Sequence, residues 1–97
     1  MSQQQIVEAE ASAGDVAFKE GERLHQQQVV ESLRKAIIKF EEARQLFHSG
    51  KNTAGEATTL NNIGSIYSDL GEKQKALDYY AQALRLKKAV GDALEKQ

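Results

Sequence analysis

Residues 57–86 read ATTLNNIGSIYSDLGEKQKALDYYAQALRL, and the pattern of this stretch predicts the architecture of the chain. Apolar and small side chains recur in it every three or four residues, which is the spacing of a helix that is buried along one face. They are Ala57, Leu60, Ile63, Gly64, Tyr67 and Leu70, then Ala76, Leu77, Tyr80, Ala83 and Leu84. Gly71 lies between the two series, where a left-handed residue would end the first helix. The stretch therefore predicts a helical hairpin.

Small residues at fixed positions predict that these two helices pack closely. Gly64 on the first helix, with Ala76 and Ala83 on the second, would let the two backbones approach each other. Tyr67 and Tyr80 would fill the space beside them. The hairpin is therefore expected to be held by backbone proximity as well as by large side chains.

This arrangement resembles the tetratricopeptide repeat. The matching pattern is Leu60-x2-Ile63-Gly64-x2-Tyr67 followed by Ala76-x3-Tyr80-x2-Ala83, with Leu60 in place of the usual Trp. The run GEATTLNNIG at 55–64 is most similar to the longer repeats, of about 42 residues, in kinesin light chains and bacterial scaffold proteins. The resemblance implies an all-α fold of two helix-turn-helix repeats, four helices in all, in a short right-handed solenoid segment.

The first half of the chain predicts a second, less regular hairpin. Its helices are expected at 3–28 and 30–48, with residues 27–32 in a longer turn. The expected buried faces are Ile6, Ala9, Ala13, Val16, Ala17, Gly21 and Leu24, then Leu33, Ala36, Ile37, Phe40, Ala43 and Phe47. The series from Ala36 to Ala43 matches the series from Ala76 to Ala83 at an offset of 76 − 36 = 40 residues, and Gly21 matches Gly64 at 64 − 21 = 43. Degeneracy of this kind is typical of a terminal repeat.

Capping signals place the remaining boundaries within a single domain over 1–97. The run 49–52 ends the second helix, and Thr53-x-x-Glu56 predicts a capping box before a third helix at 54–70. A fourth helix is expected at 73–90, after which Gly91 and Asp92 form a turn and residues 93–97 begin a further, truncated helix. Repeat one thus spans about 3–50 and repeat two about 53–91.

Composition excludes several classes of function. The chain has 97 residues, a net charge of −1, interleaved acids and bases, and no Cys. Nucleic-acid or anionic-membrane binding would need clustered Lys and Arg, and thiolate metal sites and disulfides need Cys. No apolar run approaches the ~20 residues of a membrane span, and the first residues do not form a secretory signal. The expected setting is cytoplasmic.

No set of residues in the sequence supports catalysis, a cofactor or a metal. His25 and His48, the only histidines, fall on different predicted helices without ligand spacing to a carboxylate. Glu41 and Glu42 are predicted to be solvated surface residues. Of the three tyrosines, Tyr67, Tyr79 and Tyr80, the two at core spacing, Tyr67 and Tyr80, are assigned to packing. The chain is therefore not expected to be an enzyme.

The resemblance implies a binding surface for a protein or peptide on the concave face, lined by the first helix of each repeat. On the third helix the matching residues are Thr58, Asn61, Asn62, Ser65, Ser68 and Asp69, with Asn62 the strongest contact. On the first helix they are Phe18, Lys19, Glu22 and Gln26. The implied function is a protein-interaction scaffold. A polar face that only keeps the protein in solution is the alternative for these residues.

The alternative function is a structural unit that stacks on copies of itself and binds no separate ligand. The fourth helix carries Leu77, Leu84 and Leu86, and no complete helix follows to cover them. Apolar surface is therefore expected to remain open at this end. Pairing of two such ends predicts a homodimer.

Overall fold

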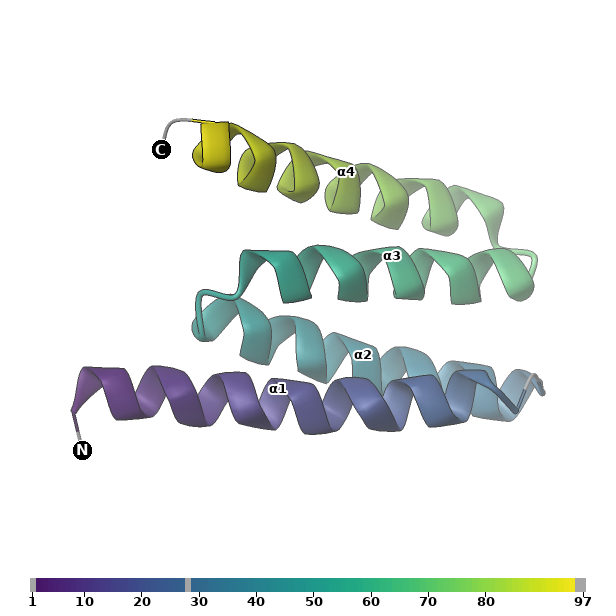
Figure 1. Cartoon of the computed structure of the whole chain (residues 1–97). Coiled ribbons are helices and arrows are strands. Elements are labelled where there is room, and N and C mark those ends of the chain that lie inside the picture. Colours follow the sequence, from purple (N-terminus) through teal and green to yellow (C-terminus); the bar gives the residue numbers. More distant parts are fainter. Residues whose placement is uncertain (1, 28, 96–97) are drawn as a thin grey trace.

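Four helices make up the described part of the chain. A computed structural model describes residues 2–27 and 29–95, and shows no strand among them. The helices are α1 (Gln3–His25), α2 (Val30–Ser49), α3 (Thr53–Asp69) and α4 (Lys73–Glu95). They form one stack in chain order, with the chain ends at opposite sides of it (Figure 1). The all-α prediction is confirmed.

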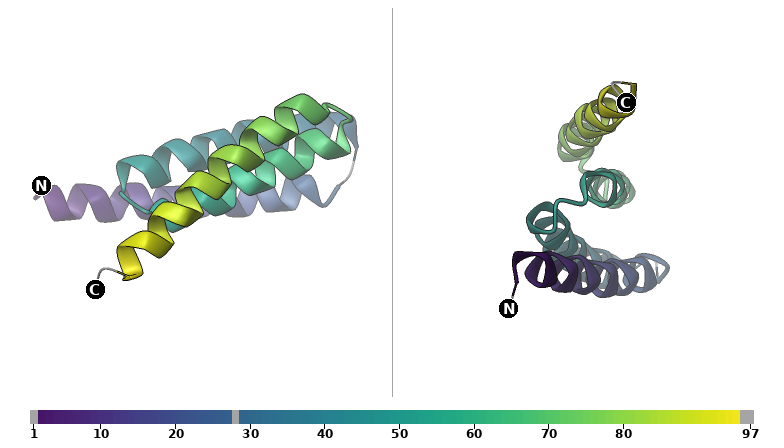
Figure 2. Two further views of the ribbon diagram at one scale, coloured as in Figure 1. Left: turned by 90° about the horizontal axis from the view of Figure 1, so that it is seen from above. Right: turned by 60° about the vertical axis from the view of Figure 1, so that its left-hand side comes forward.

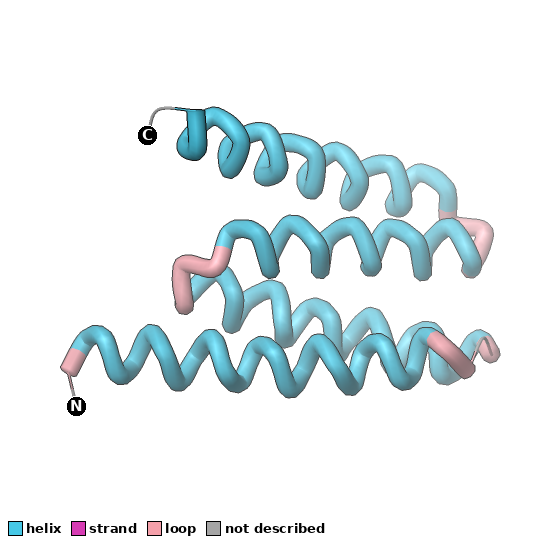
Figure 3. Tube along the Cα trace, viewed as in Figure 1, coloured by secondary structure: helices cyan, strands magenta, loops and turns pink. Residues whose placement is uncertain are grey.

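Neighbouring helices pack as two hairpins placed side by side. α1 packs against α2, α3 packs against α4, and α2 also packs against α3. The turns after α1 and α3 lie at one end of the stack and the turn after α2 lies at the other (Figure 3). Views from other sides show the same order and show α4 crossing α3 obliquely (Figure 2). The predicted pair of helix-turn-helix units is therefore present.

The core is centred on α2, because this helix has neighbours on two sides. All six predicted core residues of α2 are buried, from Leu33 to Phe47. Leu33, Ile37 and Phe40 form one cluster with Leu24 of α1 and with two isoleucines of α3. A second cluster joins Phe47 and Ala43 to α1. Both hairpins therefore share one continuous packing layer.

In each hairpin, a glycine lets the two helices approach each other closely. A Cβ added at Gly64 would lie 2.8 Å from Cδ1 of Tyr80 and 3.2 Å from the carbonyl oxygen of Ala76. A Cβ added at Gly21 would lie 2.8 Å from Cδ1 of Phe40. The pairing of glycine and aromatic ring thus recurs in both repeats. The predicted contact at Gly64 is confirmed.

The buried face of α1 differs from the predicted one. Gly14, Ala17, Gly21 and Leu24 are buried, and Val7 and Ala11 are half-buried, but Ile6, Ala9, Ala13 and Val16 are exposed. The ring of Phe47 lies where a Cβ at Gly14 would reach it, at 2.9 Å. α1 is turned so that Gly14 and Gly21 face α2 in place of Ile6 and Val16, because a glycine leaves room for the rings of Phe47 and Phe40.

α3 buries two faces, of which the sequence pattern predicted one. Ala57, Leu60 and Gly64 are buried as expected from the hairpin. Thr59 and Ile66 are also fully buried, because α3 lies between α2 and α4. Thr59 tolerates burial because its hydroxyl donates to the carbonyl oxygen of Gly55 at 2.7 Å.

On α4, the hairpin-facing residues are a subset of those predicted. Ala76 and Ala83 are buried and Tyr80 is half-buried, whereas Leu77 and Leu84 are exposed. The two alanines bring α4 close to α3, and this close packing turns the two leucines away from it. Their assignment to the hairpin face was therefore wrong.

The turn after α2 begins α3 with a different cap from the one predicted. Asn52 is the N-cap, and its side-chain oxygen accepts from the N–H of Gly55 at 2.8 Å. Thr53 is the first residue inside the helix, so the predicted capping box of Thr53 and Glu56 is wrong. The turn between α1 and α2 is also shorter than predicted, because Ser32 lies in the first turn of α2.

A left-handed residue follows the C-cap of both α2 and α3: Lys51 with φ 60° and Gly71 with φ 77°. The hydrogen bonds match in the two turns: Asn52 N–H donates to the carbonyl oxygen of Phe47 at 2.8 Å, and Glu72 N–H donates to that of Tyr67 at 2.8 Å. The predicted left-handed Gly71 is confirmed. Lys51 takes the same conformation with a side chain that disfavours it.

Exchanging these two residue types should shift stability in opposite directions. We expect Lys51→Gly to raise the free energy of unfolding by roughly 1 kcal/mol, because a glycine relieves the strain of a left-handed residue. Gly71→Ala should lower it by a similar amount, since no atom lies within 4 Å of an added Cβ and only the backbone is strained. Urea unfolding of the two variants tests this. A destabilised Lys51→Gly would contradict it.

The turn predicted at Gly91 and Asp92 is absent. α4 continues through both residues to Glu95, so the predicted start of a separate helix at residue 93 is wrong, and residues 96–97 lie outside the described part. A glycine inside a helix costs ~1 kcal/mol relative to Ala but keeps its N–H donor, so the helix can pass through it.

Candidate functional site

A hollow of about 270 Å³ lies between α1 and the start of α3. Phe18 of α1 and Phe47 of α2 line it with aromatic carbon. Asp15 of α1 and Thr58 of α3 line it with polar atoms. Phe18 is held in place by its neighbours, since its ring meets that of Phe40 edge-on at 5.2 Å between centroids. The hollow thus has a rigid apolar lining and a polar edge.

The predicted binding stripe of α3 begins beside this hollow. The stripe comprises Thr58, Asn61, Asn62, Ser65, Ser68 and Asp69. Thr58 lines the hollow, and its hydroxyl donates to the carbonyl oxygen of Ala54 at 3.1 Å. Asn61, Asn62 and Ser65 are partly exposed, and within residues 2–27 and 29–95 the structure gives their side chains no hydrogen-bond partner. Their donors and acceptors are therefore available to a ligand.

Asp69, the last residue of the stripe, makes a contact that joins the two repeats. Nε2 of His25, the last residue of α1, lies 3.0 Å from a carboxylate oxygen of Asp69. His25 is thus placed by a carboxylate far away in sequence. The contact connects the ends of α1 and α3 beyond the region where Asn62 lies.

The predicted residues of α1 do not all belong to this surface. Phe18 lies at the hollow, and Glu22 and Gln26 are exposed. Lys19 instead lines a different hollow of about 460 Å³, between α1 and α2, together with Val16 and Arg23. Asp15, which lines the first hollow, was missed because an exposed acid beside a glycine gives no periodic signal.

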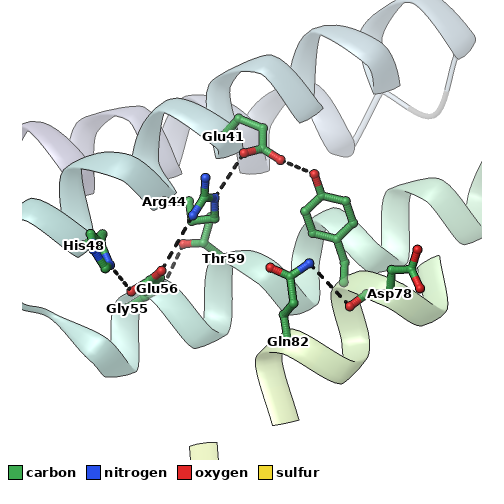
Figure 4. A network of polar contacts seen from close by, with 9 residues as sticks. Glu41, Arg44, His48, Gly55, Glu56, Thr59, Asp78 and Gln82 are labelled. Carbon is green, nitrogen blue, oxygen red and sulfur yellow. Dashed lines mark hydrogen bonds and ion pairs between the residues drawn. The ribbon is translucent and has the colours of Figure 1, made fainter. Parts of the chain in front are cut away.

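A polar network between α2, α3 and α4 was not predicted (Figure 4). Glu41 accepts a hydrogen bond from the Tyr79 hydroxyl of α4 and pairs with Nε of Arg44 at 3.1 Å. Arg44 reaches Glu56 of α3 at 3.7 Å, and Nδ1 of His48 lies 3.2 Å from the same carboxylate. Glu41 is therefore not the freely solvated residue expected, because α4 folds over it.

Within this network, Tyr79 connects α4 to both α2 and α3. Burial, and then the hydrogen bond to Glu41, raise the pKa of the Tyr79 hydroxyl well above its usual range. Its ring stacks on that of Tyr67 at 5.5 Å between centroids. The hydroxyl therefore stays protonated as a donor, and its role is to fix one hairpin against the other.

Within the described residues, 2–27 and 29–95, no three His, Asp or Glu side chains are grouped so that they could share a metal ion. No helix in this part of the chain has the length and hydropathy that a membrane crossing requires.

Comparison with models of protein families gives a match over most of the chain. The sequence profile described as tetratricopeptide repeat matches residues 24–89, which include α2, α3 and most of α4. Comparison with curated protein sequences and with solved structures returned no significant match. The profile match does not distinguish the longer, kinesin-light-chain-like type of repeat.

Proposed function

The chain belongs to the tetratricopeptide repeat family, whose repeats generally mediate protein–protein interaction, and on this basis we propose that it is an interaction scaffold holding an extended segment of a partner protein along α1 and α3. The family is a non-catalytic scaffold family. The observation that carries the proposal is the open polar stripe of α3 beside the aromatic hollow.

The chemistry of the stripe suits a polypeptide backbone. A carboxamide such as that of Asn62 can donate to a carbonyl oxygen and accept from an N–H at once. Ser65 lies one turn further along the same exposed side of α3, and its hydroxyl can also do both. An extended segment leaves its backbone groups unpaired, so a row of such side chains can bind it without reading its sequence.

The hollow would add preference for one kind of side chain. Phe18 and Phe47 offer an apolar surface, and the hollow of about 270 Å³ is large enough for an aliphatic or aromatic side chain of the partner. Binding would then combine backbone contacts at the stripe with one anchoring side chain near Thr58.

Asn62→Ala should weaken binding without affecting the fold. A random dodecapeptide library displayed on phage and selected on the immobilised chain supplies the peptide, and calorimetry gives its Kd. We expect Kd to rise about 3- to 10-fold, the effect of one or two lost hydrogen bonds. The melting temperature should stay the same, because the Asn62 side chain has no partner in the described structure.

Gln45→Ala is the matched control, since it removes another exposed carboxamide, from α2 outside the stripe. Its Kd should equal that of the parent chain. Equal affinities for all three proteins would remove the stripe from the proposal, and failure to select any peptide would favour the alternative that the polar face serves only solubility.

A further inference from the structure

We propose that two copies of this chain associate about a two-fold axis through the exposed face of α4, with the two α4 helices antiparallel. The contact surface is the α4 patch, defined as Leu77, Ala81 and Leu84, all exposed in the described structure. Leu77 is 59% exposed and Leu84 is 69% exposed. This surface lies on α4, outside the groove proposed for a partner segment, so the two inferences stand separately.

The internal repeat shows what normally covers such a face. Leu77 corresponds to Ile37 at the 40-residue offset, 77 − 37 = 40. Ile37 is only 8% exposed, because Ile63 and Ile66 of α3 pack in the same cluster. Leu77 therefore lies at the α4 position that corresponds to a residue covered by α3 in the first repeat, and no described residue covers it on α4. A second copy can cover it in the same way as α3 covers α2.

Head-to-tail stacking is disfavoured by the other end of the molecule. The 43-residue offset places Glu20 and Arg23 of α1 where α3 has Ile63 and Ile66, since 63 − 43 = 20 and 66 − 43 = 23. Arg23 Nε donates to Glu20 at 3.0 Å, and the side chains of Arg23 and Glu20 are 58% and 38% exposed. Docking the leucines of α4 there would bury an ion pair against apolar carbon, which is unfavourable. Pairing of two α4 patches avoids this.

Charge placement supports the antiparallel register. If Leu77 faces the partner's Leu84, the numbers of any two facing residues add up to 77 + 84 = 161. The two-fold axis then passes near Ala81, whose small side chain allows the helices to approach closely. Asp78 then lies near the partner's Arg85, since 78 + 85 = 163, and the two-fold axis repeats this pair. Within the described residues the structure gives neither side chain an ion-pair partner.

The same register limits the strength of the association. Lys73 would lie near the partner's Lys88, because 73 + 88 = 161, and these like charges end the apolar contact at both sides of the patch. The buried area is therefore small, and a reversible dimer of the weak, transient class is expected.

Light scattering coupled to size exclusion, over about 5 to 200 μM protein, measures the association. The parent chain should pass from monomer to dimer mass and no further. Leu84→Glu should raise the dissociation constant at least about tenfold. Ile38→Glu is the matched control: Ile38, on α2, is 66% exposed, close to the 69% of Leu84, and this variant should dimerise as the parent does.

Two more variants test the geometry. Val16→Glu places a charge at the α1 end, where the side chain is 70% exposed, and should leave the dimer intact. Asp78→Arg should weaken the dimer, and Asp78→Arg with Arg85→Asp should restore it. A parent chain that stays monomeric throughout, masses that grow beyond the dimer, loss of the dimer in Val16→Glu, or no rescue by the charge exchange would each overturn the proposal.

Discussion

Phe40→Ala is expected to lower the free energy of unfolding by about 3 to 5 kcal/mol, the range for removal of a fully buried aromatic side chain. Phe40 has 0% of its surface exposed. Its ring contacts the backbone region of Gly21 and the ring of Phe18, and it belongs to the cluster that joins α1, α2 and α3. Loss of the ring would leave a cavity bordered by three helices. Urea unfolding followed by circular dichroism gives the change in midpoint.

A loss of this size is a large share of the total stability of a small domain, which is about 5 to 15 kcal/mol. Ile38→Ala is the control, because Ile38 lies two residues away on the same helix but points to solvent. Its effect should stay within about 0.5 kcal/mol. A loss below about 1 kcal/mol for Phe40→Ala would mean that the helices do not meet at this ring.

Gly64→Leu is expected to destabilise the chain by about 1 to 3 kcal/mol or more, through overpacking and not through a cavity. The first side-chain atom alone would lie 2.8 Å from the Tyr80 ring and 3.2 Å from the carbonyl oxygen of Ala76. The ring could move only by disturbing the contact between α3 and α4, and the backbone oxygen cannot move without the helix. Thermal unfolding should show a lower midpoint.

Gly91→Leu is the matched control for this substitution. Gly91 also lies inside a helix, but no atom lies within 4 Å of an added Cβ. Leucine has the better helix propensity, so the control should be neutral or gain up to about 1 kcal/mol. If Gly64→Leu and Gly91→Leu had equal midpoints, the close approach of α3 and α4 at Gly64 would be refuted.

Periodicity and small residues predicted the fold from the sequence. The six apolar residues of the α2 face were predicted, and so was the contact of Gly64 with Tyr80, because both follow from the helical spacing of apolar and small residues. Gly71 was predicted because a left-handed residue at a helix end is a local backbone requirement. Such features need only the spacing of residues along one or two helices. The family membership followed from the same pattern.

The spacing of residues along the sequence could not predict the rotation of α1 or the second buried face of α3. Ile6 and Val16 fit a helical face as well as Gly14 and Gly21 do, and only the rings of α2 decide which face turns inward. In the same way the polar residues Thr59 and Glu56 become buried because α3 lies between α2 and α4. A sequence pattern ranks residues by hydrophobicity, whereas packing selects the face that lets two particular surfaces fit.

Some features of the candidate site were likewise predicted from the sequence, and others were seen only in the structure. The polar stripe of α3 was predicted from the sequence through its resemblance to the tetratricopeptide repeat, and its role as a binding surface stays a prediction. The tertiary structure was needed to show that Thr58 and Phe18 border one hollow, that His25 lies beside Asp69, and that Glu41 accepts a hydrogen bond from Tyr79. Each of these contacts joins residues of different helices, and the distances between helices follow from how side chains of all four fit together, which no single stretch of sequence specifies.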